Sequence, residues 1–134
     1  MIFLDSSFLV SVEVETDQNH KRAIEIRDGI IKGTFGMPII SDYIFDETVT
    51  VTFGRTKNLG KTVLVGENLL KSSKMTKIGD SFFEEGWKIF KNQKDTKFSF
   101  TDCTTIALMK KEGIKAIATF DKDFNNVKEI TAVG

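Results

Sequence analysis

The stretch SFTDCTTIALMKKEGIKAIATFDKDF, residues 99–124, decides the fold class because it predicts a helix followed by a buried strand. Its first residues are polar and suited to capping, they include Asp102, and Gly113 is a natural stop for the helix. An apolar run, Ile114–Phe120, then predicts a strand that ends at Asp121. One acid therefore begins a helix and another follows a strand, and in open α/β sheets functional sites form at that edge.

The beginning of the chain repeats this placement of an acid after a strand. Ile2–Leu4 is a short apolar run that predicts a buried strand, and Asp5 follows it directly. Asp is also a favourable residue at the start of a helix, so Asp5 is equally suited to a capping role. The residues alone leave both roles open.

Helices and strands are expected to alternate along the rest of the chain. We predict helices over residues 17–33, 62–71 and 80–90, a last edge strand within 127–133, a loop at 37–42 with Ser41 as a helix cap, and a polar basic connection at 71–77. This alternation predicts an α/β fold, in which a mainly parallel sheet is sandwiched between helices.

The segment around Glu47 has two interpretations. Thr48–Phe53 alternates like a half-buried strand, and its β-branched residues favour that state. Yet Ile44, Glu47 and Val51 fall at helical spacing on one face. If the segment is a helix, Glu47 lies on an apolar stripe, where a carboxylate is costly unless it is paired or bound to a cation.

Composition bounds the class of protein. The chain has 134 residues, with 19 Lys and Arg against 19 Asp and Glu, so its net charge is zero. We expect one domain over residues 1–134, and the charge balance argues against a protein that coats nucleic acid through bulk charge. The single cysteine, Cys103, cannot form an internal disulfide, and no apolar run approaches the roughly 20 residues of a membrane-spanning helix. A cytoplasmic protein without membrane attachment is expected.

Two further motifs favour structural interpretations. Residues 54–62, GRTKNLGKT, end like a phosphate-binding loop, but five residues instead of four separate the first glycine from the Gly-Lys pair. A turn between two helices is therefore favoured. Phe83, Trp87 and Phe90 share one face of a predicted helix, a pattern typical of core, although a chain with 12 Phe could also use them at a dimer interface.

Four acids become informative when they are taken together. Each one alone is explained by capping, a turn or the helix dipole. A parallel sheet would bring them to one edge, where two carboxylates about 4 Å apart repel by roughly 4 kcal/mol at an effective dielectric constant of about 20. Such a cluster needs protons or a cation, and oxygen ligands without cysteine or paired histidines select Mg²⁺ or Mn²⁺. The acids are Asp5, Glu47, Asp102 and Asp121.

The layout of these acids resembles the PIN domain family, and in particular its VapC type of toxin ribonuclease. The resemblance covers essentially the whole chain, and its C-terminal half is the specific part. The motifs that carry it are Phe3-Leu4-Asp5-Ser6-Ser7, Asp46-Glu47-Thr48, Ser99-Phe100-Thr101-Asp102 and Ala118-Thr119-Phe120-Asp121-Lys122-Asp123-Phe124.

The resemblance implies a fold, an activity and partners. The fold would be a Rossmann-like α/β/α sandwich with Glu47 on a helix. The activity would be that of a Mg²⁺- or Mn²⁺-dependent endoribonuclease that cleaves RNA. The protein would form a homodimer. It would act as the toxin of a type II toxin–antitoxin pair and bind a cognate antitoxin. The four acids match the family's metal-holding quartet, where the metal would activate water for attack on phosphorus.

The same resemblance suggests supporting residues. Ser6 matches a small hydroxyl position after the first acid, and Asp123 ranks below the quartet because the family varies there. Arg55, Lys57 and Lys61 are candidate contacts to the RNA backbone, although a solvated charged loop is the favoured explanation for each of them.

Three alternatives remain open at the level of the residues. One is an RNA-processing endonuclease that is not a toxin, and another is a PIN fold that binds RNA or protein without cutting. The third is a phospho-receiver domain, which requires an acidic pair after the first strand. The segment Asp5-Ser6-Ser7 supplies only one acid there.

Overall fold

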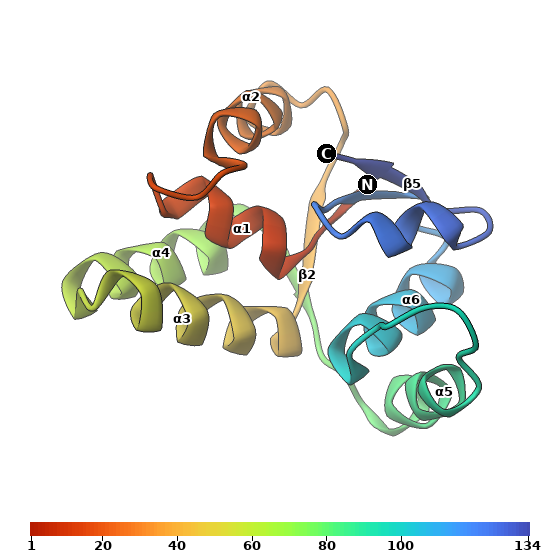
Figure 1. Ribbon diagram of the computed structural model, residues 1–134. Helices are drawn as coiled ribbons and strands as arrows, with labels where there is room; N and C mark the ends of the chain where they lie inside the picture. The colour runs from red at the N-terminus through yellow and green to blue at the C-terminus, as the bar shows by residue number, and fades with distance from the viewer.

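The computed structural model describes residues 1–134 as a five-stranded sheet with helices on both faces (Figure 1). Every pair of neighbouring strands is parallel, and the strand order is β3-β2-β1-β4-β5. The predicted α/β sandwich with a parallel sheet is therefore confirmed.

The elements follow one another with short connections. In chain order they are β1 (Ile2–Leu4), α1 (Ser6–Glu13), α2 (His20–Ile31), β2 (Pro38–Ser41), α3 (Asp42–Thr56), α4 (Leu59–Ser72), β3 (Lys74–Thr76), α5 (Asp80–Lys91), α6 (Phe100–Glu112), β4 (Ala116–Ala118), the short 3₁₀ helix η1 (Lys122–Asn126) and β5 (Thr131–Val133). None of the helices combines the length and the apolar composition that crossing a membrane requires.

The direction of the chain across the sheet reverses beside β1. The chain runs from β1 to β2 and β3, and then crosses back to β4 on the other side of β1. Right-handed crossovers place helices on opposite faces when that direction reverses. Figure 1 shows α1 to α4 gathered on one side of the sheet and α5 and α6 on the other. The carboxyl ends of β1 and β4 therefore form the switch point of the sheet, where ligands bind in this class of fold.

The core is built around β1. Ile2 and Phe3 are completely buried, as are Ile40 from β2 and Ile117 from β4. Because β1 has a parallel neighbour on each side and helices on both faces, its short run of residues is apolar without alternation.

The segment that contains Glu47 is the helix α3, in agreement with the expectation from the resemblance. Ser41 caps it by accepting a hydrogen bond from the backbone N–H of Ile44 at 3.1 Å. Ile44, Thr48 and Thr52 are spaced by one helical turn and are completely buried. Packing of this face therefore outweighs the strand preference of the Thr and Val residues, which is a context-dependent preference.

Two short strands were missed in the sequence. Residues 37–42 were expected to be a loop, but Pro38–Ser41 form β2, with Pro38 as the first residue, where its lack of an N–H is tolerated. Within the expected connection at 71–77, Lys74–Thr76 form the edge strand β3. Strands of three or four residues are too short to carry an alternating pattern, and main-chain pairing with a neighbour defines them.

The expected core stripe on α5 is exposed, which corrects the sequence interpretation. Phe83, Trp87 and Phe90 keep 48%, 50% and 37% of their surface exposed. The helix packs on α6 beside this stripe, at Gly86, which is buried and where a Cβ atom would lie 3.1 Å from the Thr104 backbone. Gly86 thus allows the backbones of α5 and α6 to approach each other closely, and the three rings contact α6 through Phe100, its first residue.

We expect Gly86→Ala to lower the free energy of unfolding by about 1–3 kcal/mol, because the new methyl group meets backbone atoms that cannot rotate away. The matched control is Gly54→Ala, also inside a helix but with nothing within 4 Å of the added Cβ. That change should raise stability by about 0.5–1 kcal/mol through helix propensity. Urea unfolding followed by circular dichroism measures both, and equal effects of the two substitutions would contradict the close contact.

Candidate active site

The two acids that follow strands leave the sheet side by side. Leu4 at the end of β1 is in register with Ala118 at the end of β4, and the backbone N–H of Asp5 donates to the Ala118 carbonyl at 3.0 Å. Asp121 follows β4 after two further residues. The sheet topology thus brings Asp5 and Asp121 to one edge, as the sequence predicted.

Asp5 is a buried carboxylate held by hydroxyl groups. Its side chain makes no capping hydrogen bond to α1, although its backbone occupies the cap position. Instead Oδ2 accepts from Ser7 Oγ at 2.8 Å and from Thr119 Oγ1 at 2.7 Å, and the residue is only 3% exposed. Burial raises the pKa of Asp5, and the negative charge of Glu47 adds to this rise, while the two hydroxyl bonds oppose it.

Ser7 and Thr119 are functional candidates that the sequence reasoning missed. Besides binding Asp5, Ser7 Oγ accepts from the backbone N–H of Phe120 at 3.0 Å, and Thr119 Oγ1 accepts from that of Asp121 at 3.0 Å. The two hydroxyls therefore join the ends of β1 and β4 and orient both acids. The available signal was a hydroxyl residue placed beside each acid just after its strand.

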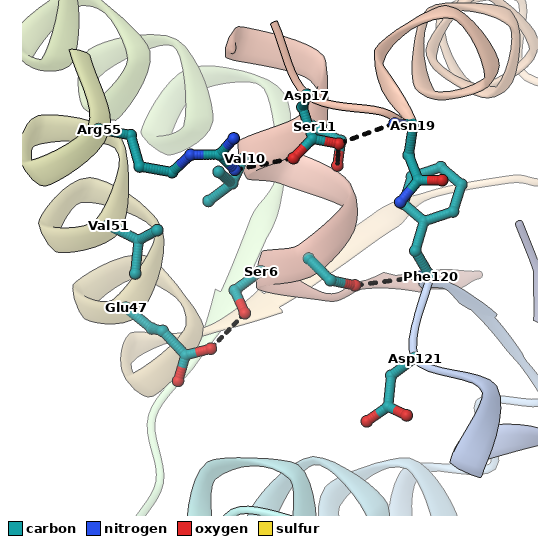
Figure 2. Close-up of a pocket in the computed structure, with 11 residues that line it drawn as sticks. Ser6, Val10, Ser11, Asp17, Asn19, Glu47, Val51, Arg55, Phe120 and Asp121 are labelled. Atoms are coloured by element: carbon teal, nitrogen blue, oxygen red, sulfur yellow. Dashed lines mark hydrogen bonds and ion pairs between the residues drawn. The ribbon is translucent and has the colours of Figure 1, made fainter.

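Glu47 reaches the same edge from α3. The hydroxyl of Ser6, which the resemblance suggested as a supporting residue, donates a hydrogen bond to Glu47 Oε1. Figure 2 shows Glu47 and Asp121 facing the same space from opposite sides, with Ser6 above and between them. Helix α3 and the turn after β4 therefore form two walls of one site.

Asp102 has a structural role and an electrostatic one. Its carboxylate accepts from the backbone N–H of Ser99 at 3.0 Å, and the Ser99 hydroxyl accepts from the backbone N–H of Asp102 at 3.1 Å, which completes a capping box for α6. Such bonds lower the pKa of a carboxyl. The pKa of Asp102 is nevertheless raised to about 7, chiefly by burial, then by the charge of Asp5 and, less, by that of Asp121. The charges of Asp5 and Asp121 thus add to the effect of burial on Asp102.

Asp121 and Asp123 differ in their surroundings. Asp121 caps the short helix η1 by accepting from the backbone N–H of Asp123 at 2.9 Å. The carboxylate of Asp123 accepts from the backbone N–H of Lys97 at 3.0 Å, which ties this turn to the segment before α6. Asp123 is thus engaged in holding a loop, in keeping with its lower rank in the sequence analysis.

A cleft of about 420 Å³ opens between these elements (Figure 2). Glu47 and Asp121 line it, together with Ser6 and Ser7. A neighbouring hollow of about 360 Å³ shares Glu47 with the cleft and continues toward the start of α6 at Thr101.

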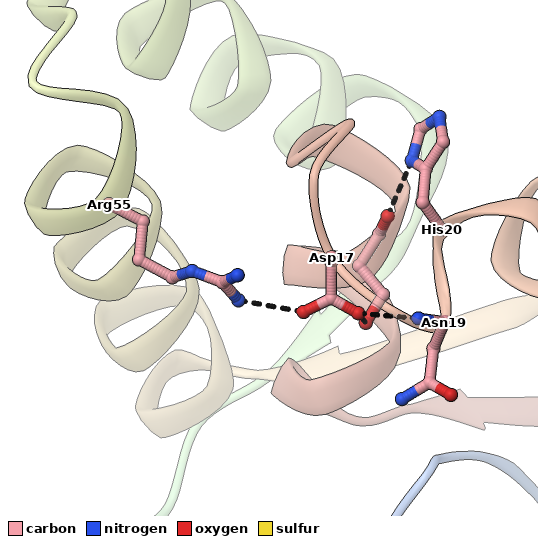
Figure 3. Close-up of polar contacts among 5 residues, drawn as sticks. Asp17, Asn19, His20 and Arg55 are labelled. Carbon is pink, nitrogen blue, oxygen red and sulfur yellow. Dashed lines mark hydrogen bonds and ion pairs between the residues drawn. The ribbon is translucent and has the colours of Figure 1, made fainter.

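Arg55 is the cationic side chain in the wall of the cleft. Its Nη1 lies 2.7 Å from Asp17 Oδ2, while Asp17 Oδ1 accepts from Ser11 Oγ and from the backbone N–H of Asn19, both at 2.9 Å (Figure 3). The guanidinium lowers the pKa of Asp17, so this acid stays ionised as a fixed anchor. His20, the single histidine of the chain, hydrogen-bonds the Ser11 carbonyl through Nδ1 at 2.8 Å.

The other two predicted cationic contacts lie apart from the acids. Lys61 Nζ donates to the Glu13 carbonyl at 2.8 Å, so its ammonium group joins α4 to the end of α1. Lys57 lies in the left-handed turn between α3 and α4 and is exposed. Neither residue lines the cleft that holds Glu47 and Asp121.

The donor set fits a hard divalent cation. Every candidate ligand is a carboxylate or hydroxyl oxygen, and none of the ion pairs in the structure involves any of the four acids. No three acidic, cysteine or histidine side chains are gathered closely enough to enclose an ion by themselves. This suits Mg²⁺, which is commonly held by one or two carboxylates while water and phosphate oxygens complete its shell. Asp5, Glu47, Asp102 and Asp121 are the candidates from which those one or two carboxylate ligands would come.

Comparison with known sequences gives one family and one curated relative. The PIN domain pattern matches residues 2–130. The chain is 24% identical over 128 residues to a Mycobacterium tuberculosis protein named "23S rRNA-specific endonuclease VapC20". The aligned region covers 93% of this chain and 92% of that protein.

Solved structures show the same fold. The crystal structure of Mycobacterium tuberculosis VapC20, described as a sarcin-ricin loop cleaving toxin, matches with a TM-score of 0.83 and 24% identity over 94% of each chain. A protein from Pyrobaculum aerophilum matches with a TM-score of 0.67 and 13% identity, over 98% of this chain and 88% of that one.

The raised pKa of Asp102 predicts how stability depends on pH when divalent cations are chelated. Between the ordinary pKa of 3.8 and the folded value of about 7, the folded protein binds more protons than the unfolded chain, so stability falls as pH rises through this range. At pH 8, Asp102→Asn should raise the free energy of unfolding on the order of 1–3 kcal/mol, since partial exposure reduces the full penalty. At pH 4 the gain should vanish.

The control for this experiment is Asp95→Asn, a change at an exposed acid in the connection before α6. Chemical unfolding at both pH values measures the difference. A loss of stability at pH 8 in Asp102→Asn would mean that the capping box outweighs the repulsion among the acids.

Proposed function

The chain belongs to the PIN domain family, and from this premise we propose that it is a divalent-cation-dependent endoribonuclease that serves as the toxin of a type II toxin–antitoxin pair. One observation carries the proposal. Glu47 and Asp121 line one cleft at the switch point of the sheet, Asp5 and Asp102 lie on elements that begin or end around it, and no Lys, Arg or His side chain pairs with any of these four acids.

Placing unpaired carboxylates there lowers the free energy of unfolding, and a purely structural role does not account for such a loss. Burial raises the pKa of Asp5, and burial together with the charges of Asp5 and Asp121 raises that of Asp102 to about 7. A site that served stability alone would place a cation or apolar residues there. Carboxylates with perturbed pKa values next to a cleft are typical of catalytic sites.

The residues have separate roles in the proposed reaction. A bound Mg²⁺ or Mn²⁺ would supply activation of water and neutralisation of charge on the phosphodiester. Asp5, Glu47, Asp102 and Asp121 would hold the ion. The hydroxyls support them, because Ser6 fixes Glu47, while Ser7 and Thr119 fix Asp5. Arg55 faces the RNA backbone from the wall of the cleft.

The relatives suggest a substrate and a setting for the proposed activity. Because the curated relative is named a 23S rRNA-specific endonuclease, ribosomal RNA is the first substrate to test. A cognate antitoxin protein, a homodimer and a cytoplasmic site of action complete the proposal. The Phe-rich face of α3 and α4, which exposes Phe53, Leu59 and Val63, is compatible with a protein contact.

We expect the purified protein to cut ribosomal RNA in Mg²⁺ or Mn²⁺ and to lose this activity in EDTA. Asp5→Asn and Glu47→Gln should each lower the cleavage rate by about 100-fold or more, a typical cost of removing a group that positions a reacting proton or charge. The matched control is Asp46→Asn, an exposed acid that precedes Glu47 on α3, and it should keep most of the activity.

Two outcomes would contradict the proposal. Cleavage that survives both Asp5→Asn and Glu47→Gln would place the activity elsewhere or in a contaminant. Binding of RNA without cleavage in any divalent cation would favour the PIN fold that binds without cutting.

Arg55 gives a second test of the same proposal. One of its five N–H donors pairs with Asp17, and the rest of the fork is free for a phosphate. Arg55→Lys should raise KM by about 3- to 10-fold with little change in kcat, and Arg55→Met should reduce the salt dependence of binding by about one ion. Arg27→Lys, at an exposed arginine that pairs with Asp28 on α2, is the control. A pure kcat effect would assign Arg55 to the reacting atoms instead.

A further inference from the structure

The cleft extends past the acids to a second polar end, and we propose that this end binds a phosphate of the RNA that flanks the cleaved one, with Asp17 as its positioning residue. Arg55 on α3 and Asn19 at the start of α2 supply the donors, and Asp17 holds both. The inference rests on the proposed function, because it names a further part of the same substrate that the cleft would hold.

Asp17 joins three segments of the chain through one carboxylate. Oδ2 lies 2.7 Å from Nη1 of Arg55, and Oδ1 accepts from the hydroxyl of Ser11 on α1 and from the backbone N–H of Asn19, both at 2.9 Å (Figure 3). Only 14% of the Asp17 side chain is exposed. Both of its oxygens therefore have partners within the protein, and they fix the end of α3 against α1 and the start of α2.

Donor groups at this end of the cleft are left for a ligand. The pairing with Asp17 uses one of the five N–H donors of Arg55, whose side chain is 41% exposed. Asn19 bonds Asp17 through its backbone N–H, and its side chain makes no capping bond to α2. Figure 2 shows Arg55 and Asn19 on opposite sides of the upper part of the cleft, as Glu47 and Asp121 are of the lower part. Guanidinium and amide N–H groups are suited to phosphate oxygens.

The spacing along α3 assigns this end to a different phosphate from the one at the acids. Glu47, Val51 and Arg55 all line the cleft and are four residues apart, so they follow one face of the helix. At 1.5 Å per residue, Arg55 lies about 12 Å beyond Glu47 along the helix axis. Its guanidinium is also tied to Asp17 and does not turn back toward Glu47. A strand with its cleaved phosphate at the acids would thus place a flanking phosphate at Arg55.

The charges in the cleft make the orientation of Arg55 matter more than its charge. Asp17 neutralises the guanidinium, and the other charged side chains that line the cleft are the acids Glu47 and Asp121. No excess of positive charge therefore draws RNA to this end. A planar guanidinium that is already fixed loses little freedom when a phosphate binds. Removal of the Asp17 charge should accordingly weaken RNA binding, whereas Coulomb attraction alone would make it stronger.

The test compares Asp17→Asn with Glu15→Gln, which removes one negative charge at an exposed position of the same connection between α1 and α2. We expect Asp17→Asn to raise KM for RNA cleavage by about 3- to 10-fold with little change in kcat, the loss typical of one hydrogen bond. Glu15→Gln should leave both constants unchanged. The same factor is expected for binding of a dye-labelled single-stranded RNA in Mg²⁺, measured with Asp5→Asn present in every variant so that the RNA stays intact.

A double substitution separates positioning from a loss of stability. Arg55→Met should weaken RNA binding by a similar factor. If Asp17 acts through Arg55, adding Asp17→Asn to Arg55→Met should weaken binding by less than about twofold more, because the pair is no longer independent. Melting curves of each variant show that it is folded.

A modified RNA locates the phosphate. One neutral methylphosphonate linkage is moved along the strand, one position at a time. At one linkage that flanks the cleavage site it should weaken binding to the protein with Arg55 by about 3- to 10-fold. In Arg55→Met the same linkage should have no effect, since its partner is already missing.

Each other outcome has a definite meaning. Cleavage of RNA with unchanged KM and binding in Asp17→Asn and Arg55→Met would overturn the flanking subsite and leave the nuclease proposal intact. Tighter binding by Asp17→Asn, or a methylphosphonate effect that persists in Arg55→Met, would also overturn it. The expected binding pattern in a protein that never cuts RNA would support the subsite and refute the nuclease. A protein that binds no RNA would contradict both.

Discussion

The buried carboxylate of Asp5 is the constraint on which the site depends. It lies at the end of the central strand, is almost inaccessible to water, and has hydroxyl groups rather than a cation as its partners. A hydroxyl satisfies a lone pair without neutralising the charge, so the cost of burial remains. The hydroxyl partners in turn require the ends of β1 and β4 to be adjacent, and only the parallel register of these strands provides this.

The residues that form the site therefore lower the stability of the fold. Helix α6 begins with a capping box whose acid is also crowded by the other carboxylates, so one side chain both stabilises a helix and strains the site. Natural sites often keep such local costs because function needs them, and the rest of the core offsets them. Here the completely buried residues of β1, β2 and β4 supply that compensation.

Much of the fold and the placement of the acids could be predicted from sequence, since both follow from order along the chain. Acids just after apolar runs, at Asp5 and Asp121, meet at one edge in any parallel sheet. The features that were missed depend on contacts between distant segments. Lys74–Thr76 become a strand only by pairing with β2, and the salt bridge from Arg55 to Asp17 joins residues far apart in the chain. The exposed rings on α5 were misjudged because helical periodicity marks an apolar face without saying whether anything covers it.

The polar, lysine-rich composition of the edge strand β3, which made this strand hard to predict from sequence, has a physical role of its own. It has only three residues, it begins with Lys74, and Lys71 and Lys77 flank it. An open sheet edge can pair with the edge of another molecule and so start aggregation, and short, lysine-rich edges resist this because pairing would bring like charges together. The polar composition of this segment thus keeps a parallel sheet with an open side from joining its neighbours, which matters most while newly made chains are folding close to one another.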